Sequence, residues 1–196
     1  MNTGILGGTF NPIHNGHISL AEHFLQLTDV DEVWFMVTPQ NPWKRDSQLA
    51  DDNLRLEMVS RALEGHDRLH ASDYEFHLDR PSYSYITLRH LRADYPEHVF
   101  TLLIGADNWV KFDQWANHEE ILRHHNVAVY PRRHCHVDTD TLPDNVVFVD
   151  MPLLDISSTD IRQMLREGKD VAAYVPENIE ATVKKAYPKT KDSGKP

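Results

Sequence analysis

The sequence predicts an α/β fold with a mainly parallel sheet, and three observations support that prediction. Apolar segments typical of strands alternate with segments whose apolar residues recur at helical spacing. The strand segments are almost continuously apolar, as in "EVWFMV" at 32–37, which is typical of strands covered by helices on both faces. The chain of 196 residues, 40% of them hydrophobic, has the length and composition of one globular domain.

The first part of the chain supplies three strands and two helices. Asp51 and Asp52 can accept hydrogen bonds from the free N–H groups of a helix start, and Leu54, Met58 and Ala62 follow at helical spacing. The predicted elements are a strand at 3–6, a helix at 18–27, a strand at 32–37, a loop at 40–46, a helix from Asp51 or Asp52, and a strand at 69–74.

The second part continues the alternation, which predicts strand–helix–strand units with right-handed crossovers. From residue 80 onward the predicted elements are a helix that ends before Pro96 with Ile86 and Leu91 facing inward, strands at 98–107, 126–131 and 145–150, a helix from Ser157 or Ser158 to about Gly168, and a helix at 177–186. We therefore expect one domain over 1–187 with a small C-terminal helical segment, and a disordered tail at 188–196.

The composition predicts a cytoplasmic protein that binds neither nucleic acid nor membranes. The formal net charge is −10, from 30 acidic and 20 basic side chains, so the overall field repels a polyanion. No apolar run approaches the ~20 residues of a membrane span, and the single Cys135 suits a reducing compartment. The sequence leaves open whether the chain forms a homo-oligomer.

Local clusters of charge matter more for a small ligand than the net charge does. A small anion could be held by cations gathered at one place, and the candidates are Lys44, Arg45, Lys111, Arg132, Arg133 and Arg162. Most of the 13 histidines have polar neighbours in the sequence, and we expect these at the surface: His66, His70, His98, His118, His124 and His125.

The chemistry is expected where the parallel strands end, because ligands of such sheets bind beyond the carboxyl ends where the strand order reverses. That edge would collect residues 7–17, 40–44, 105–107 and 157–162. The first segment, "GGTFNPIHNGH", joins a strand to a helix. It offers backbone N–H groups, a helix N-terminus with a partial positive charge, and two imidazoles three residues apart. These features predict a pocket for phosphate.

Other interpretations of this segment fit less well. It contains neither the G-x-x-x-x-G-K-[ST] loop nor G-x-G-x-x-G. A helical zinc pair usually needs a third ligand and often a Glu beside the first His, where this chain has Asn15. Two histidines that only cap and pack are a further alternative, but Gly16 between them suggests that something approaches the backbone closely.

The same segment resembles a known signature. "HNGH" is similar to the H-x-G-H signature of the nucleotidyltransferase superfamily related to class I aminoacyl-tRNA synthetases, and "GGTFNPIHNGH" resembles its form in bacterial nicotinate-nucleotide adenylyltransferases. Four more segments agree in order: "NPWK" at 41–44, "RPSYSYITL" at 80–88, "IGADNWVKFDQW" at 104–115 and "ISSTDIR" at 156–162. The resemblance extends to about Tyr187 and implies a Rossmann-like, doubly wound fold.

The resemblance implies an activity in NAD biosynthesis. The 5′-phosphate of nicotinate mononucleotide would attack the α-phosphorus of ATP in line, giving nicotinate adenine dinucleotide and pyrophosphate with Mg²⁺ assisting. No covalent enzyme intermediate would be required, since such a transfer depends on positioning and electrostatic stabilisation.

The resemblance also implies roles for individual residues. The catalytic set would be His14, His17, Lys44 and Arg162, with the histidines donating hydrogen bonds to the triphosphate. ATP would be bound by Gly7, Gly8, Thr9, Phe10, Gly16, Gly105, Asp107, Ser157, Ser158 and Thr159, with Gly16 leaving room for adenine or ribose and Asp107 accepting from a ribose hydroxyl. Nicotinate mononucleotide would be bound by Lys44, Ser84, Tyr85 and Trp115. No residue is expected to ligate a metal.

Some of these residues have simpler explanations. Ser157 to Thr159 could be an ordinary helix cap, and Trp115 could belong to the core. The chain also departs from the family pattern: Asn11 replaces a common Asp, Trp43 stands where a His commonly precedes Lys44, and "YPRR" at 130–133 differs from the usual Arg-Arg-Pro or Lys-Arg-Pro order. The sequence does not decide between Arg132 and Arg133 as the phosphate-facing residue.

Two other functions are compatible with the same motifs. The first keeps the chemistry and changes the acceptor to nicotinamide mononucleotide, phosphopantetheine or another phosphorylated alcohol. The second is a catalytically idle nucleotide-binding module on the same fold. A full aminoacyl-tRNA synthetase is excluded because the chain lacks room for an anticodon domain, lacks a K-M-S-K-S loop and is acidic.

Overall fold

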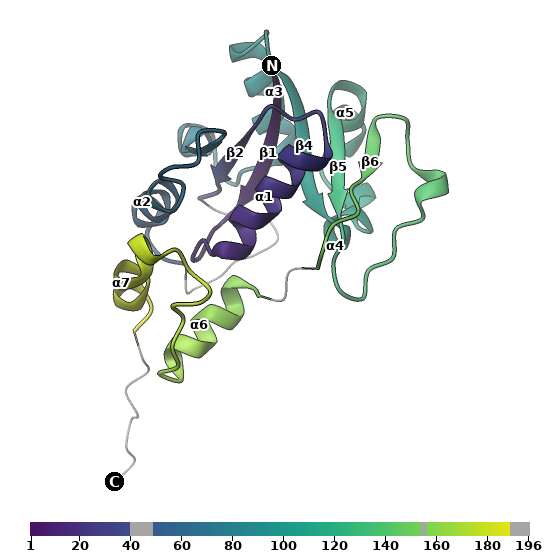
Figure 1. The fold of residues 1–196 in the computed structure, drawn as a ribbon. Helices are drawn as coiled ribbons and strands as arrows, with labels where there is room; N and C mark the ends of the chain where they lie inside the picture. Colours follow the sequence, from purple (N-terminus) through teal and green to yellow (C-terminus); the bar gives the residue numbers. More distant parts are fainter. Residues whose placement is uncertain (40–48, 154–155, 189–196) are drawn as a thin grey trace.

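A six-stranded parallel sheet forms the centre of the molecule (Figure 1). The structure is a computed structural model that describes residues 1–39, 49–153 and 156–188. The strand order β3-β2-β1-β4-β5-β6 confirms the predicted doubly wound arrangement, and every neighbouring pair runs parallel. The strands are β1 (Asn2–Gly8), β2 (Glu32–Val37), β3 (Leu69–Ser72), β4 (Val99–Gly105), β5 (Asn126–Tyr130) and β6 (Val146–Phe148).

Helices cover both faces of this sheet. One hydrophobic core cluster fills the space between one face of the sheet and four helices. These helices are α1 (Asn15–Leu27), α2 (Asp52–Ala62), α6 (Ser158–Arg166) and α7 (Glu177–Ala186). The other face is covered by α3 (Ser84–Asp94) and α5 (His118–His124). Shorter helical turns are η1 (Tyr74–His77), α4 (Ala106–Trp109), η2 (Phe112–Gln114) and η3 (Thr139–Thr141). In the described part of the chain, no helix is both long and apolar enough to cross a membrane.

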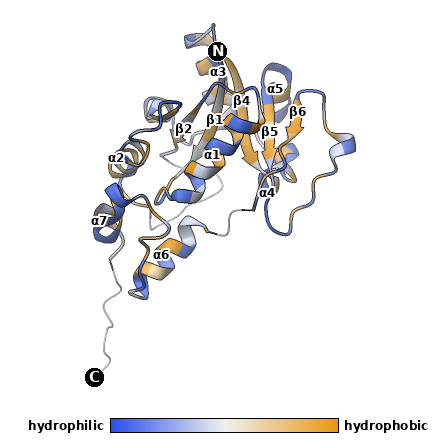
Figure 2. Ribbon diagram, viewed as in Figure 1, coloured by the Kyte–Doolittle hydropathy of each residue, from blue (hydrophilic) through white to orange (hydrophobic). Residues whose placement is uncertain are grey.

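The continuous apolar character of the strands follows from this layering. Ile5 belongs to the core cluster on the α3 face, whereas Leu6 belongs to the one on the α1 face. The same alternation separates Leu102 from Leu103 in β4. Figure 2 shows β4, β5 and β6 predominantly hydrophobic, while the helices carry hydrophilic residues as well. Both sides of each central strand are therefore buried, as the sequence predicts.

Most predicted elements are present, and the differences lie at their ends. Helix α1 begins at Asn15 rather than Ile18, because the Asn15 backbone N–H donates to the Tyr174 carbonyl oxygen at 2.8 Å and gives the helix start a tertiary anchor. Strand β3 ends at Ser72, where η1 follows. Leu91 is buried as predicted, but Ile86 is only half-buried. The predicted tail at 188–196 lies outside the described residues except for Pro188, and the whole of the predicted loop at 40–46 lies outside them too.

Two of the histidines expected at the surface are largely covered: His125 is buried and His98 is partly buried. The His98 side chain is 12% exposed and stacks on the Phe100 ring, with ring centroids 5.6 Å apart. His125 is 7% exposed, and burial lowers its pKa to about 4. Polar neighbours in the sequence did not reveal that the His98 ring lies against Trp34 of β2 as well as against the nearby Tyr95 and Phe100.

A buried arginine joins three parts of the chain at the carboxyl edge of the sheet. Arg55 on α2 is fully buried, and its guanidinium donates to three backbone carbonyl oxygens, those of Thr9, Thr38 and Ala50. Its Nη2 also contacts the Asp52 carboxylate at 2.6 Å. One side chain thus fixes the end of β2, the residue that follows β1, and the approach to α2.

We predict that Arg55→Met lowers the free energy of unfolding by about 3 kcal/mol or more, because several buried carbonyl oxygens lose their donor. Denaturant unfolding measures this loss. Arg61→Met is the matched control, since Arg61 lies on the same helix with its side chain 47% exposed, and a change within about 0.5 kcal/mol is expected. Equal effects of the two substitutions would contradict the assigned role of Arg55.

Candidate functional site

The predicted ligand edge exists at the centre of the sheet. The segment after β1, residues 9–14, is called the first turn here, and it leads into α1. Gly105 is the last residue of β4, which is the neighbour of β1 in the sheet, and Asp107 follows in α4. The strand order reverses between these two strands, which is where sheets of this type bind ligands. Figure 1 shows α6 and α7 beyond the same edge.

The carbonyl oxygens around the first turn accept hydrogen bonds from other parts of the chain. Because C=O and N–H point in opposite directions across a trans peptide, the N–H groups that follow the bound carbonyls of Gly8, Thr9 and Pro12 are directed away from those partners. The Thr9 N–H therefore points away from β2 and toward the β4 side. The Asn11 carbonyl is followed by Pro12 across a cis peptide bond, so no N–H follows it. The donors are the Thr38 N–H to Gly8, Arg55 to Thr9, Arg162 to Asn11 and the Ser158 hydroxyl to Pro12.

His14 and His17 lie together at the start of α1, as their spacing predicts. Their ring centroids are 3.7 Å apart with an interplanar angle of 30°. The His14 backbone N–H donates to His17 Nδ1 at 3.3 Å, so a neutral His17 carries its proton on Nε2. The Phe10 ring packs edge-on against His17, with centroids 5.0 Å apart, and fixes the far side of that ring.

Both imidazoles are held in the neutral form. Burial and, to a smaller extent, the positive charge of Arg132 lower the pKa of His14 to about 4, although Asp160 opposes the shift. Burial also lowers the pKa of His17 well below its usual value, with His14 and Arg132 adding to the effect. At neutral pH the site therefore presents uncharged N–H donors beside a separate cationic group.

Two glycines make room for protein side chains at this site. A Cβ at Gly16 would lie 2.9 Å from His14 Nδ1 and 3.2 Å from Ile156 Cγ2. The space beside Gly16 is thus taken by the His14 ring and Ile156, which differs from the expectation that it leaves room for adenine or ribose. A Cβ at Gly105 would lie 2.4 Å from Asp107 Oδ1 and 2.9 Å from Arg132 Nε. By contrast, a Cβ at Gly7 would meet nothing within 4 Å.

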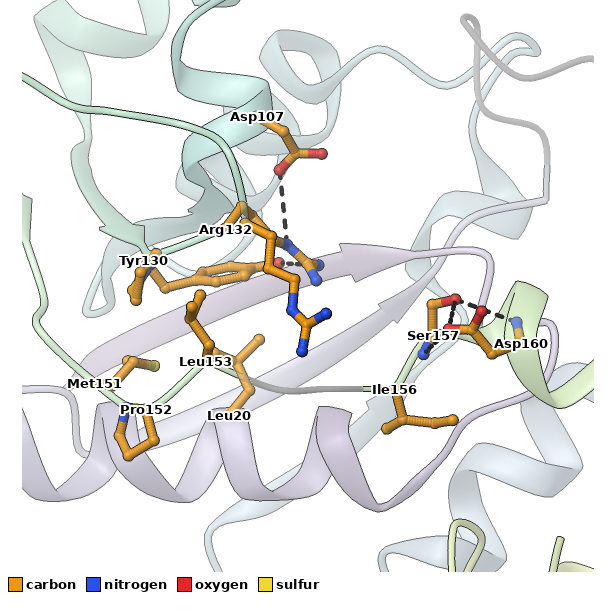
Figure 3. Close-up of a pocket in the computed structure, with 12 residues that line it drawn as sticks. Leu20, Asp107, Tyr130, Arg132, Met151, Pro152, Leu153, Ile156, Ser157 and Asp160 are labelled. Atoms are coloured by element: carbon orange, nitrogen blue, oxygen red, sulfur yellow. Dashed lines mark hydrogen bonds and ion pairs between the residues drawn. The ribbon is translucent and has the colours of Figure 1, made fainter.

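A cavity of about 300 Å³ opens beside α1, where Leu20 lines it (Figure 3). Neither His17 nor any residue of the first turn is among the residues that line it. Arg132 lies over the Tyr130 ring, with the guanidinium 4.9 Å from the ring centroid, and its Nη2 donates to the Tyr130 hydroxyl at 3.0 Å. Its Nε lies 3.6 Å from Asp107 Oδ1. Arg133 lines the cavity as well, so both arginines left undecided by the sequence face the same space.

The start of α6 closes another side of the cavity. Ser157 caps the helix, and Asp160 completes a capping box by accepting from the Ser157 N–H at 2.9 Å. Ser157 and Asp160 line the cavity across from Asp107 in Figure 3. The ordinary cap considered from the sequence is therefore present. The sequence interpretation missed Asp160, although the spacing in "SSTD" is the signal of a capping box.

The remaining α6 residues connect to the first turn or to each other. The Ser158 hydroxyl donates to the Pro12 carbonyl oxygen at 2.8 Å. Arg162 donates to the Asn11 carbonyl oxygen at 2.7 Å and to the Thr159 hydroxyl at 3.3 Å. The structure thus brings the predicted Ser158 and Arg162 to the first turn, where they also support its backbone.

The residues predicted to bind the second substrate lie elsewhere. Ser84 begins α3, and Tyr85 and Trp115 pack against the core cluster on the α3 face. The centroids of the Trp115 and Phe112 rings are 5.3 Å apart, which fits packing in the core. None of Ser84, Tyr85 and Trp115 lines the cavity. Lys44 and the Trp43 departure lie outside the described residues. Within residues 1–39, 49–153 and 156–188, no group of three or more His, Cys, Asp or Glu side chains could hold a metal, so a zinc site has no third ligand there.

Comparison with known proteins identifies the class first. Residues 5–164 match the model of one family, which is described as cytidylyltransferase-like. The fold supports this: a solved structure described as "Plasmodium falciparum nicotinic acid mononucleotide adenylyltransferase complexed with NaAD" aligns with a TM-score of 0.79 over 95% of both chains. At 20% identity that likeness establishes the fold alone. The class defined by fold and site is a cytidylyltransferase-like protein.

Bacterial relatives narrow the family. A Bacteroides fragilis protein named "Probable nicotinate-nucleotide adenylyltransferase" is 49% identical over 173 residues, which cover 88% of this chain and 86% of that protein. A Bacteroides thetaiotaomicron protein of the same name is 47% identical over 175 residues, covering 89% and 87%. This chain belongs to the nicotinate-nucleotide adenylyltransferase family.

We predict that keeping His14 neutral makes stability depend on pH. The pKa of His14 falls from 6.5 to about 4 on folding, so the unfolded chain binds more protons between these values. The contribution of neutral His14 to the free energy of unfolding is fully present above pH 6.5 and is lost as the pH falls. By pH 4.5 the loss amounts to about 2 to 3 kcal/mol. Urea unfolding from pH 4.5 to 7.5 should show a flatter pH dependence for His14→Gln than for the unsubstituted protein. Parallel curves for the two proteins would contradict the burial effect.

Proposed function

We propose that this protein transfers the AMP moiety of ATP to nicotinate mononucleotide, giving nicotinate adenine dinucleotide and pyrophosphate in NAD biosynthesis. The relatives that share almost half of its sequence carry this activity in their names. The phosphate of nicotinate mononucleotide would attack the α-phosphorus of ATP directly. The site provides hydrogen-bond donors and cations for this reaction and needs no covalent enzyme intermediate.

The observation that carries the proposal is the pair of imidazoles at the N-terminus of α1, whose ring centroids lie 3.7 Å apart. His17 holds its proton on Nε2, because its Nδ1 already accepts from the His14 backbone. We assign both rings to the ATP triphosphate, where their hydrogen bonds strengthen as negative charge moves toward the leaving pyrophosphate. The N-terminus of α1 and the first-turn amides add donors for the same anion.

The other predicted residues fall into two groups. For ATP we propose Gly7, Gly8, Thr9, Phe10, Gly105, Asp107, Ser157, Ser158, Thr159 and Arg162, with Arg132 and Arg133 as cations at the cavity. For nicotinate mononucleotide we propose Trp115 as the stacking surface, and the N–H groups at the start of α3, at Ser84 and Tyr85, for the carboxylate. Lys44 remains a proposed contact of either substrate.

Magnesium fits the site as an ion that arrives with the triphosphate. The two carboxylates at the cavity already have partners, since Asp107 pairs with Arg132 and Asp160 belongs to the capping box. Mg²⁺ keeps several waters and is commonly held by substrate phosphates with one or two carboxylates, and Asp107, 56% exposed, is the side chain placed to help. When bound, the ion would neutralise charge on the phosphate oxygens.

The acceptor is tested by comparing substrates. Purified protein with Mg·ATP should release pyrophosphate when nicotinate mononucleotide is supplied, with a higher kcat/KM than with nicotinamide mononucleotide or phosphopantetheine. A helix N-terminus favours a carboxylate over a neutral carboxamide, which is the reason for the expected preference. A preference for the carboxamide would change the assigned acceptor, and no release with any acceptor would leave only a nucleotide-binding module.

The histidines are tested by removing each ring. His14→Ala and His17→Ala should each lower kcat by roughly 10²- to 10³-fold, because each loses a donor to charge that develops in the transition state. His77→Ala is the matched control, since the His77 side chain is 73% exposed and belongs to η1 rather than to α1. Unchanged ATP consumption in folded His14→Ala and His17→Ala proteins would refute the assignment.

A further inference from the structure

The last tyrosine of the sequence reaches back to the first turn. Tyr187 follows α7, where its backbone N–H bonds to the Val183 carbonyl oxygen at 3.0 Å and its ring packs against the core cluster of the α1 face. Its hydroxyl donates to Asn11 Oδ1 at 2.5 Å, across 176 positions of sequence. Burial raises the pKa of the Tyr187 phenol, so the hydroxyl stays protonated and remains a donor at neutral pH.

Asn11, which receives this hydrogen bond, lies in the middle of the first turn and is 2% exposed. Its amide oxygen accepts a second hydrogen bond from the Ala50 N–H at 3.1 Å, and its backbone carbonyl accepts from Arg162 at 2.7 Å. It follows Phe10, whose φ of 43° is unusual for a side chain of that size. One residue therefore joins the turn to α6, to the approach to α2, and to the C-terminal end of the domain.

We propose that Tyr187 is a positioning residue for the paired imidazoles and acts through the Asn11 side chain. This inference rests on the proposed function, and it adds a residue that the motifs do not contain. A turn with a residue in the left-handed region keeps its shape only when its surroundings determine it. His14 comes three residues after Asn11, so loosening the Asn11 amide moves the N-terminus of α1 and the rings that it carries.

Tyr187→Phe tests this directly, because it removes the hydroxyl and keeps the ring that packs on the core. We expect kcat to fall on the order of tenfold, with the KM of each substrate changed less than about twofold, since small displacements of catalytic groups are costly in the transition state. The ¹⁵N signals of the His14 and His17 imidazoles should shift as well. Tyr174→Phe is the matched control, a tyrosine 38% exposed, and should leave kinetics and signals unchanged.

A double-substitution cycle tests whether the effect passes through Asn11. Adding Tyr187→Phe to Asn11→Ala should change kcat by less than about twofold, because the acceptor is already absent. Asn11→Asp keeps an acceptor oxygen, so Tyr187→Phe should still lower kcat about tenfold in that background. An equal effect of Tyr187→Phe with and without the Asn11 side chain would overturn the proposal.

The role of Tyr187 and the proposed function can each be refuted separately. Unchanged kinetics and unshifted imidazole signals in Tyr187→Phe, with the unsubstituted protein active on nicotinate mononucleotide, would overturn the role of Tyr187 and leave the function standing. No turnover by the unsubstituted protein with any acceptor would refute the proposed function. The ¹⁵N signals of the His14 and His17 imidazoles would then still decide whether Tyr187 positions these two rings.

Discussion

The first turn depends on hydrogen bonds that its own residues cannot make. Its carbonyl oxygens are bound by groups from α2 and α6, of which the most deeply buried is the Arg55 guanidinium. A buried carbonyl without a donor costs free energy, so the turn keeps its shape only inside the completed fold. The site is therefore a product of the tertiary structure, although its residues are contiguous in the sequence.

In this site, hydrogen-bond donation and positive charge come from different side chains. Burial keeps His14 and His17 neutral, so that two rings 3.7 Å apart can act as donors without repelling each other. Positive charge comes instead from Arg132, which is anchored on Tyr130 and faces the open cavity. An acidic chain with a net charge of −10 can thus bind a triphosphate, because the cations are local to one edge of the sheet.

The sequence predicted the fold closely because the apolar pattern of the strands and the residues at the strand ends were both strong signals. Nearly continuous apolar strands such as 32–37 indicate a sheet covered on both faces, and the strand after residue 98 ends in the glycine and acid of the ligand edge. The histidine pair was predicted from spacing alone. Contacts between distant segments were beyond prediction. No feature of the sequence marked Arg55, whose hydrogen bonds reach Thr9 and Thr38. Asn11 was noted as a departure from a motif, whereas the structure gives it partners at residues 50, 162 and 187.

The account is tested most directly by a crystal structure of the protein with Mg²⁺ and a non-hydrolysable ATP analogue. The account predicts triphosphate oxygens within about 3.2 Å of the His17 Nε2 atom and of first-turn N–H groups, with the first-turn carbonyl oxygens still bound to their present donors. Phosphates bound away from the imidazoles, or a first turn that exchanges its carbonyl partners to receive them, would contradict it.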